Sequence, residues 1–74
     1  MKNSSIHIIY HPTLRGYSGY SREIDGIQSE GKTIEELFDK IRLLIEVRVK
    51  SLKEIGKDKE AADLKNKEII FSED

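Results

Sequence analysis

The chain has 74 residues, of which 36% are hydrophobic and 36% are charged, and its formal net charge at pH 7 is −1. This length predicts a single domain, residues 1–74, that buries only about 60% of its unfolded surface and needs help from a partner. The balanced charge argues against direct nucleic-acid binding. The lack of cysteine excludes disulfides and cysteine-bearing zinc sites.

Near the start, residues 6–11 are mostly β-branched or aromatic and stop at Pro12, which predicts a first strand. Alternation puts Ile9 on one face of this strand with His7 and His11. The two histidines are about 13 Å apart along a strand, too far to share a metal ion. We therefore expect no metal site and no cofactor. The apolar run is also too short for a signal peptide or membrane span, so we expect a cytoplasmic protein with no membrane partner.

A second strand is expected over residues 17–22, where Gly19 suggests a bulge or a close backbone approach. Tyr17 and Tyr20 are three residues apart, so they must point to opposite faces. One tyrosine therefore serves the core and the other faces outward, and the spacing leaves open which is which. The outward tyrosine is either a cross-strand packing residue or an aromatic anchor for a partner.

The dipeptide Asp25-Gly26 between Ile24 and Ile27 predicts a short hairpin, because both residue types tolerate positive φ. A brief third strand over residues 27–30 should follow. Gly31 then leads into a helix.

Thr33 and Glu36 have the spacing of a capping box, so the helix is expected to begin at Ile34. Apolar residues then recur at helical spacing as far as Gly56, a stop signal. This helix would be about 33 Å long, whereas a six-residue strand spans about 20 Å, so its last two turns overhang the sheet. Apolar side chains on the overhang need cover from the C-terminal tail or from another chain.

We therefore predict an oligomer, a dimer or larger, whose interface contains the residues of this overhang: Val47, Arg48, Val49, Leu52 and Ile55. Arg48 lies within the apolar stripe and has two interpretations. Its stem packs while the guanidinium reaches the edge, or it forms an ion pair across an interface.

Residues 57–67 look too charged for a core element, with at most one helical turn at residues 61–64, and residues 68–72 read as a fourth strand. The expected class is α+β, in the order β-β-β-α-β. A three-stranded antiparallel meander carries one long helix, and the last strand joins an edge of the sheet or exchanges with a neighbouring subunit.

The glycine, tyrosine and glutamate spacing of residues 16–26, followed by the helix opening at residues 31–37, resembles the N-terminal domain of HicB-type antitoxins. The resemblance covers roughly residues 4–55. It departs at Asp25, where proline is usual, and at Ile27, where a small residue is usual. It implies a degraded ribonuclease H-like fold and a non-catalytic antitoxin that binds and covers a HicA-type ribonuclease.

Such toxins are typically basic, so the candidate partner-binding residues are two tyrosines and three acids around the turn: Tyr17, Tyr20, Glu23, Asp25 and Glu30. Antitoxins of this kind usually add a DNA-binding domain. Only eighteen residues follow Gly56, and we expect no separate DNA-binding domain here. The alternative is a stand-alone module of the same fold, an oligomeric interaction or regulatory protein whose partner is not a HicA toxin; an inhibitor of another nuclease system is one such protein.

An enzyme is not expected. The first strand carries none of the carboxylates that a metal-dependent nuclease needs. The helix acids Asp39, Glu46 and Glu54 fit solvated charges better than catalytic groups.

Overall fold

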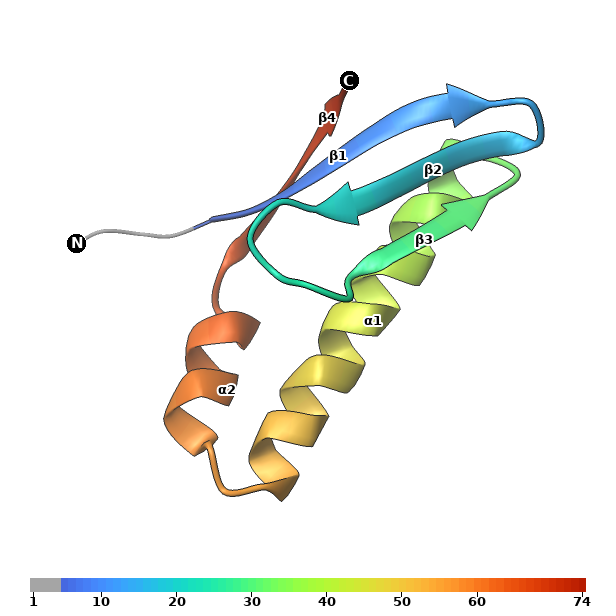
Figure 1. Ribbon diagram of the computed structural model, residues 1–74. Coiled ribbons are helices and arrows are strands. Elements are labelled where there is room, and N and C mark those ends of the chain that lie inside the picture. The colour runs from blue at the N-terminus through green and yellow to red at the C-terminus, as the bar shows by residue number, and fades with distance from the viewer. Residues whose placement is uncertain (1–4) are drawn as a thin grey trace.

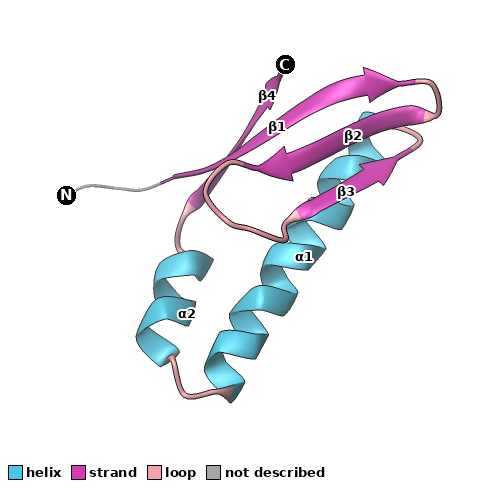
Figure 2. Cartoon of the chain, in the orientation of Figure 1, coloured by secondary structure: helices cyan, strands magenta, loops and turns pink. Residues whose placement is uncertain are grey.

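The computed structural model describes residues 5–74, which form four strands and two helices (Figures 1 and 2). In chain order these are β1 (Ser5–Thr13), β2 (Gly16–Ser21), β3 (Gln28–Gly31), α1 (Ile34–Glu54), α2 (Asp58–Lys65) and β4 (Glu68–Glu73). The α+β class, the first three strands, the long helix and the terminal strand are confirmed. The second helix was not expected as a full element.

The four strands make one mixed sheet in the order β3-β2-β1-β4. Strands β1, β2 and β3 pair antiparallel, and β4 lies parallel to β1, with Ile6 opposite Ile69. A parallel neighbour needs a long crossover, which α1 and α2 provide. The terminal strand therefore joins the β1 edge within its own chain.

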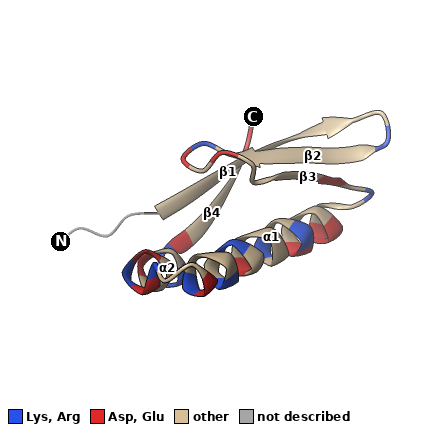
Figure 3. Ribbon diagram, turned by 60° about the horizontal axis from the view of Figure 1, so that its bottom comes forward, with Lys and Arg blue, Asp and Glu red and all other residues tan. Residues whose placement is uncertain are grey.

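Both helices are on the same side of the sheet (Figure 3). The core lies on this side, between the sheet and α1. Ile6 and Ile8 of β1 and Leu37 and Ile41 of α1 are its largest fully buried side chains. Gly19 is buried where α1 approaches β2: an added Cβ would lie 3.3 Å from both the Ile9 carbonyl oxygen and Leu37 Cδ2. The expected close approach at this glycine is confirmed.

Local signals set both ends of α1. The Thr33 hydroxyl accepts from the Glu36 amide at 3.0 Å, and the Glu36 carboxylate accepts from the Lys32 amide at 2.6 Å. At the other end Gly56 has a φ of +84°, which favours glycine. The predicted capping box and glycine stop are both present.

The prediction for residues 57–67 was wrong, because this segment contains an eight-residue helix that contributes to the core. Ala61 is fully buried and Leu64 is 8% exposed, while the charged side chains of α2 face solvent. Packing of α2 along the C-terminal half of α1 leaves Val49 and Leu52 half-buried. The overhang of α1 is thus partly covered by its own chain.

Aromatic side chains fasten β4 to α1. Phe38 stacks on Phe71 with ring centroids 3.7 Å apart, and Tyr10 meets the Phe38 ring edge-on at 5.3 Å. The guanidinium carbon of Arg42 lies over the Phe71 ring, 5.3 Å from its centre. Such pairs contribute about 1 kcal/mol beyond the area they bury.

The two-residue hairpin expected at Asp25-Gly26 was also wrong. Strand β2 ends at Ser21 and β3 begins at Gln28, so a longer loop, residues 22–27, joins them. A turn does occur at Asp25-Gly26, where Gly26 has a φ of +89°. The loop is longer because Ile27 is buried at 3% exposure and its carbonyl accepts from the Ser21 amide, which closes the loop below the turn.

Candidate partner-binding face

Residues of one side of the sheet point away from both helices. Residues that pair across neighbouring strands lie on the same face of the sheet. Three strands share one surface in this way, through the pairs Ile9–Tyr20 and His11–Ser18 and the pairs Tyr20–Gln28 and Ser18–Glu30. We call this surface the open face and define it by the following residues: His7, Ile9, His11, Ser18, Tyr20, Gln28 and Glu30. No helix among residues 5–74 covers it (Figure 3).

Tyr20 is the aromatic residue of the open face. Its side chain is 45% exposed and stands opposite the half-buried Ile9 of β1. Tyr17 is on the helix side, where it packs against the core. The structure therefore assigns the outward position to Tyr20 and the core position to Tyr17.

A shallow depression of about 380 Å³ lies beside Tyr20. Gln28 and Glu30 of β3 line its other side, and Ser18, also a residue of β2, lies opposite Glu30. Two of the predicted partner-binding residues, Tyr20 and Glu30, are thus brought together around one hollow. An aromatic wall beside a carboxylate suits a partner that presents a basic side chain.

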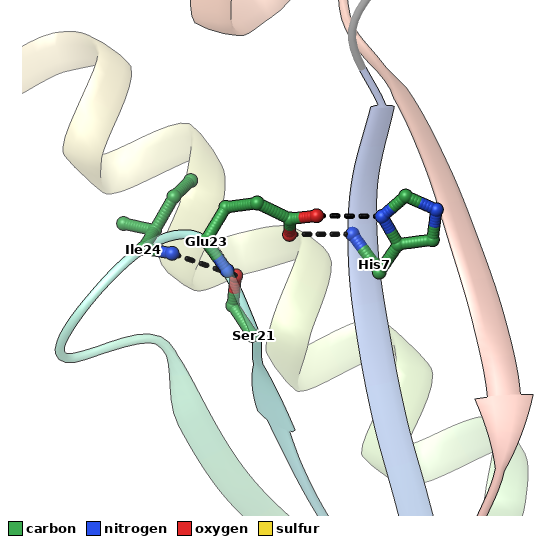
Figure 4. Close-up of polar contacts among 4 residues, drawn as sticks. All are labelled: His7, Ser21, Glu23 and Ile24. Carbon is green, nitrogen blue, oxygen red and sulfur yellow. Dashed lines mark hydrogen bonds and ion pairs between the residues drawn. The ribbon is translucent and has the colours of Figure 1, made fainter.

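Glu23 lies at the end of the open face where β2 leaves β1 (Figure 4). Its carboxylate accepts a hydrogen bond from the His7 backbone amide at 2.8 Å and contacts His7 Nδ1 at 2.6 Å. Burial by itself raises the pKa of Glu23, but the hydrogen bonds from His7 and the electrostatic attraction of its ring outweigh this and hold the pKa below its ordinary value. Glu23 is therefore a fixed negative charge and a structural contact.

The loop of residues 22–27 is held from both sides. The Ser21 hydroxyl accepts from the backbone amides of Glu23 at 3.2 Å and Ile24 at 3.0 Å, as Figure 4 shows for these residues. From the helix side, Arg48 Nη2 donates to the Asp25 carbonyl at 2.9 Å. Asp25 itself is exposed at the tip of this loop.

The residues proposed for an oligomer interface separate into two groups. Arg48, Val49 and Leu52 are half-buried by their own chain, whereas Val47 is 52% and Ile55 is 67% exposed. Arg48 thus uses its guanidinium within the chain, on the Asp25 carbonyl. Neither of the two interpretations of Arg48 specified this contact.

Sequence reasoning missed two residues that the structure brings into the argument. His7 was treated as a surface histidine, and nothing local signals that Glu23, sixteen positions along the chain, folds back onto it. Leu43 was not singled out, although it is 57% exposed on α1. Its position opposite the apolar stripe could have been found by helical projection.

Within residues 5–74, no group of three or more histidine, cysteine or acidic side chains is placed to hold a metal ion. The helices of the same segment are too short or too polar to cross a bilayer.

The fold and this surface define a small α+β domain with a four-stranded mixed sheet, helices on one face and an exposed tyrosine on the other. Comparison with protein-family models, with curated proteins and with solved structures found no match to this chain.

Proposed function

We propose that this chain is a non-catalytic antitoxin of the HicB type that binds a HicA-type ribonuclease and occludes its active site. The resemblance in residues 4–55 suggests this class. The strands and the capped helix of this region follow the expected order of elements, although a longer loop, residues 22–27, replaces the tight hairpin.

The observation that carries the proposal is the exposure of Tyr20 at the centre of the open face. Large aromatic side chains at the centre of a surface are the commonest energetic anchors of protein interfaces. Tyr20 is supported from below by the strands that carry it, so little conformational entropy is lost when a partner covers it.

The charge around this anchor fits a basic partner. Glu30 lies beside Tyr20 in the same depression, and Glu23 lies at the end of the face next to His7. The exposed Asp25 extends the acidic side along the loop. Such acids increase the association rate with a basic ribonuclease and favour it over acidic competitors.

The test uses the purified chain and any short basic protein encoded next to its gene; the absence of such a neighbour favours the alternative given below. The chain should form a stable complex with that protein and abolish its RNA cleavage at about equimolar ratio. Loss of a central aromatic anchor costs about 2 kcal/mol or more, so Tyr20→Ala should weaken binding by about thirtyfold. Glu30→Lys should mainly slow association, and more so at low salt.

Leu14→Ala is the matched control, because Leu14 is fully exposed at the β1–β2 turn and lies outside the open face. It should bind and inhibit as the unchanged chain does. A neighbouring ribonuclease that is neither bound nor inhibited contradicts the proposal. Inhibition of a nuclease of another kind instead supports the alternative, a stand-alone module of the same fold.

A further inference from the structure

We propose that the solvent-facing side of α1 is a self-association surface, on which a second copy of this chain packs its own α1 in antiparallel orientation. The inference goes beyond the antitoxin proposal, because it concerns the opposite side of the molecule from the open face.

The surface begins with two exposed apolar residues in the middle of α1. Leu43 is 57% and Val47 is 52% exposed, one helical turn apart. At about 100° per residue, Leu43 points about 160° away from the mean direction of the buried Leu37, Ile41 and Ile45. Both side chains therefore point away from the sheet, and each is more than half exposed.

Charges flank this apolar centre in a defined order. Asp39 precedes it and Lys50 follows it, and these two residues with Leu43 and Val47 fall within about 80° of arc on the helix. The first half of the stripe is thus acidic and the second half basic. Two parallel copies would bring like charges together, whereas two antiparallel copies bring Asp39 of one opposite Lys50 of the other, twice by symmetry.

The basic half is short of partners within the chain. Among residues 5–74, neither Lys50 nor Lys53 has an ion-pair partner, and both line a shallow groove of about 550 Å³ with Leu43 and Val47. Lys65 of α2 adds a third unpaired lysine to the same groove. Arg42 and Glu46 also line the groove, so it holds four cations and one carboxylate around an apolar floor. This surplus of positive charge suits an acidic amphipathic helix.

The acidic half of α1 supplies such a helix. Asp39 is 79% exposed, and its only ion pair among residues 5–74 is a 3.4 Å contact with Arg42 three residues away. Exposed pairs of this kind contribute a few tenths of a kcal/mol, so Asp39 is free to re-pair across an interface.

Four charges run against the acidic-to-basic order: Lys40, Arg42, Glu46 and Glu54. Arg42 lies over the Phe71 ring, and Glu46 lies just outside the arc of about 80° that defines the stripe. Lys40 Nζ is directed to the Glu30 carbonyl at 3.1 Å, away from the stripe. Glu54 lies at the last position of α1, beyond the proposed Asp39 and Lys50 pairs.

Analytical ultracentrifugation of the full chain at low salt, over a wide concentration range, tests the proposal. The unchanged chain should reach a monomer–dimer equilibrium. Leu43→Gln with Val47→Gln should weaken dimerisation by about tenfold or more, because the apolar centre is lost. Helix content by circular dichroism should stay the same, since both side chains are already exposed and glutamine is a good helix former.

Charge exchange tests the orientation. Asp39→Lys and Lys50→Glu should each weaken the dimer, whereas the double variant should restore it, because each reversed lysine again faces a carboxylate. Leu14 is also an exposed leucine but lies outside α1, so Leu14→Gln should leave the monomer–dimer equilibrium unchanged. A chain that is monomeric at the highest concentration, a dimer indifferent to the glutamine variants, or a double variant weaker than both singles overturns the proposal.

Discussion

The Glu23 carboxylate binds His7 twice, at the backbone amide and at ring Nδ1, although the two residues are sixteen positions apart in the chain. An ionised carboxylate only accepts hydrogen bonds, so Nδ1 must carry the hydrogen. The Arg22 amide donates to the His7 carbonyl at 3.0 Å. Beyond this point β2 leaves β1, and the Glu23 side chain accepts the hydrogen bond of the His7 amide. Glu23 thus completes the β1–β2 ladder with a side chain.

Replacing this carboxylate should loosen the start of the loop. We expect Glu23→Ala to lower the free energy of unfolding by about 1 kcal/mol, since the contact is partly exposed and screened by solvent. Urea unfolding followed by circular dichroism measures the change. Glu73→Ala in β4, also exposed and without an ion pair among residues 5–74, is the control, and an equal loss there contradicts a special role for Glu23.

The same contact should make stability depend on pH. The pKa of Glu23 is lowered from its ordinary value of 4.5, so the contribution of this group is present above that value and is lost as the pH falls through the folded-state pKa. The stability gap between the unchanged chain and Glu23→Gln should therefore be present above pH 4.5 and shrink as the pH falls below that value. Urea midpoints across this range measure it, and a gap that grows in acid contradicts the assignment.

Arg48 should act as a clamp on the β2–β3 loop. Arg48→Ala removes the donor to the Asp25 carbonyl and should cost about 1 kcal/mol. Hydrogen exchange at the Glu23 and Ile24 amides should become faster, because both belong to the clamped loop. Arg22→Ala in the same loop is the matched control: its exposed side chain has no hydrogen bond or ion pair within the described segment. Equal acceleration by both variants contradicts the clamp.

Truncating a leucine of α2 should cost more stability than truncating an exposed leucine, because α2 contributes to the core. Leu64 is buried against the core, so Leu64→Ala should lower the free energy of unfolding by about 2 to 3 kcal/mol. Leu14→Ala removes the same atoms from a fully exposed side chain and should change stability by less than about 0.5 kcal/mol. Equal effects in chemical denaturation mean that α2 does not contribute to the core.

Elements that depend on neighbouring residues were largely predictable. The capping box at Thr33 and Glu36 and the stop at Gly56 follow from short-range sterics and hydrogen bonding. The opposite faces of Tyr17 and Tyr20 follow from the period of a strand.

Features that depend on burial were not predicted from the sequence. Helix α2 has a charged sequence, and only its docking on α1 gives Ala61 and Leu64 a core to enter. The loop after Ser21 is long because Ile24 packs on the core and Ile27 is buried, which outweighs the local preference of Asp25-Gly26 for a tight hairpin.

The sequence by itself determined the order of the strands and the long helix, because alternation, helical spacing and caps act over a few residues. Only the tertiary structure decided that β4 runs parallel to β1, that Tyr20 faces outward and that Glu23 meets His7. These outcomes depend on which apolar side chains are buried together, and that free energy belongs to contacts between segments far apart in the chain.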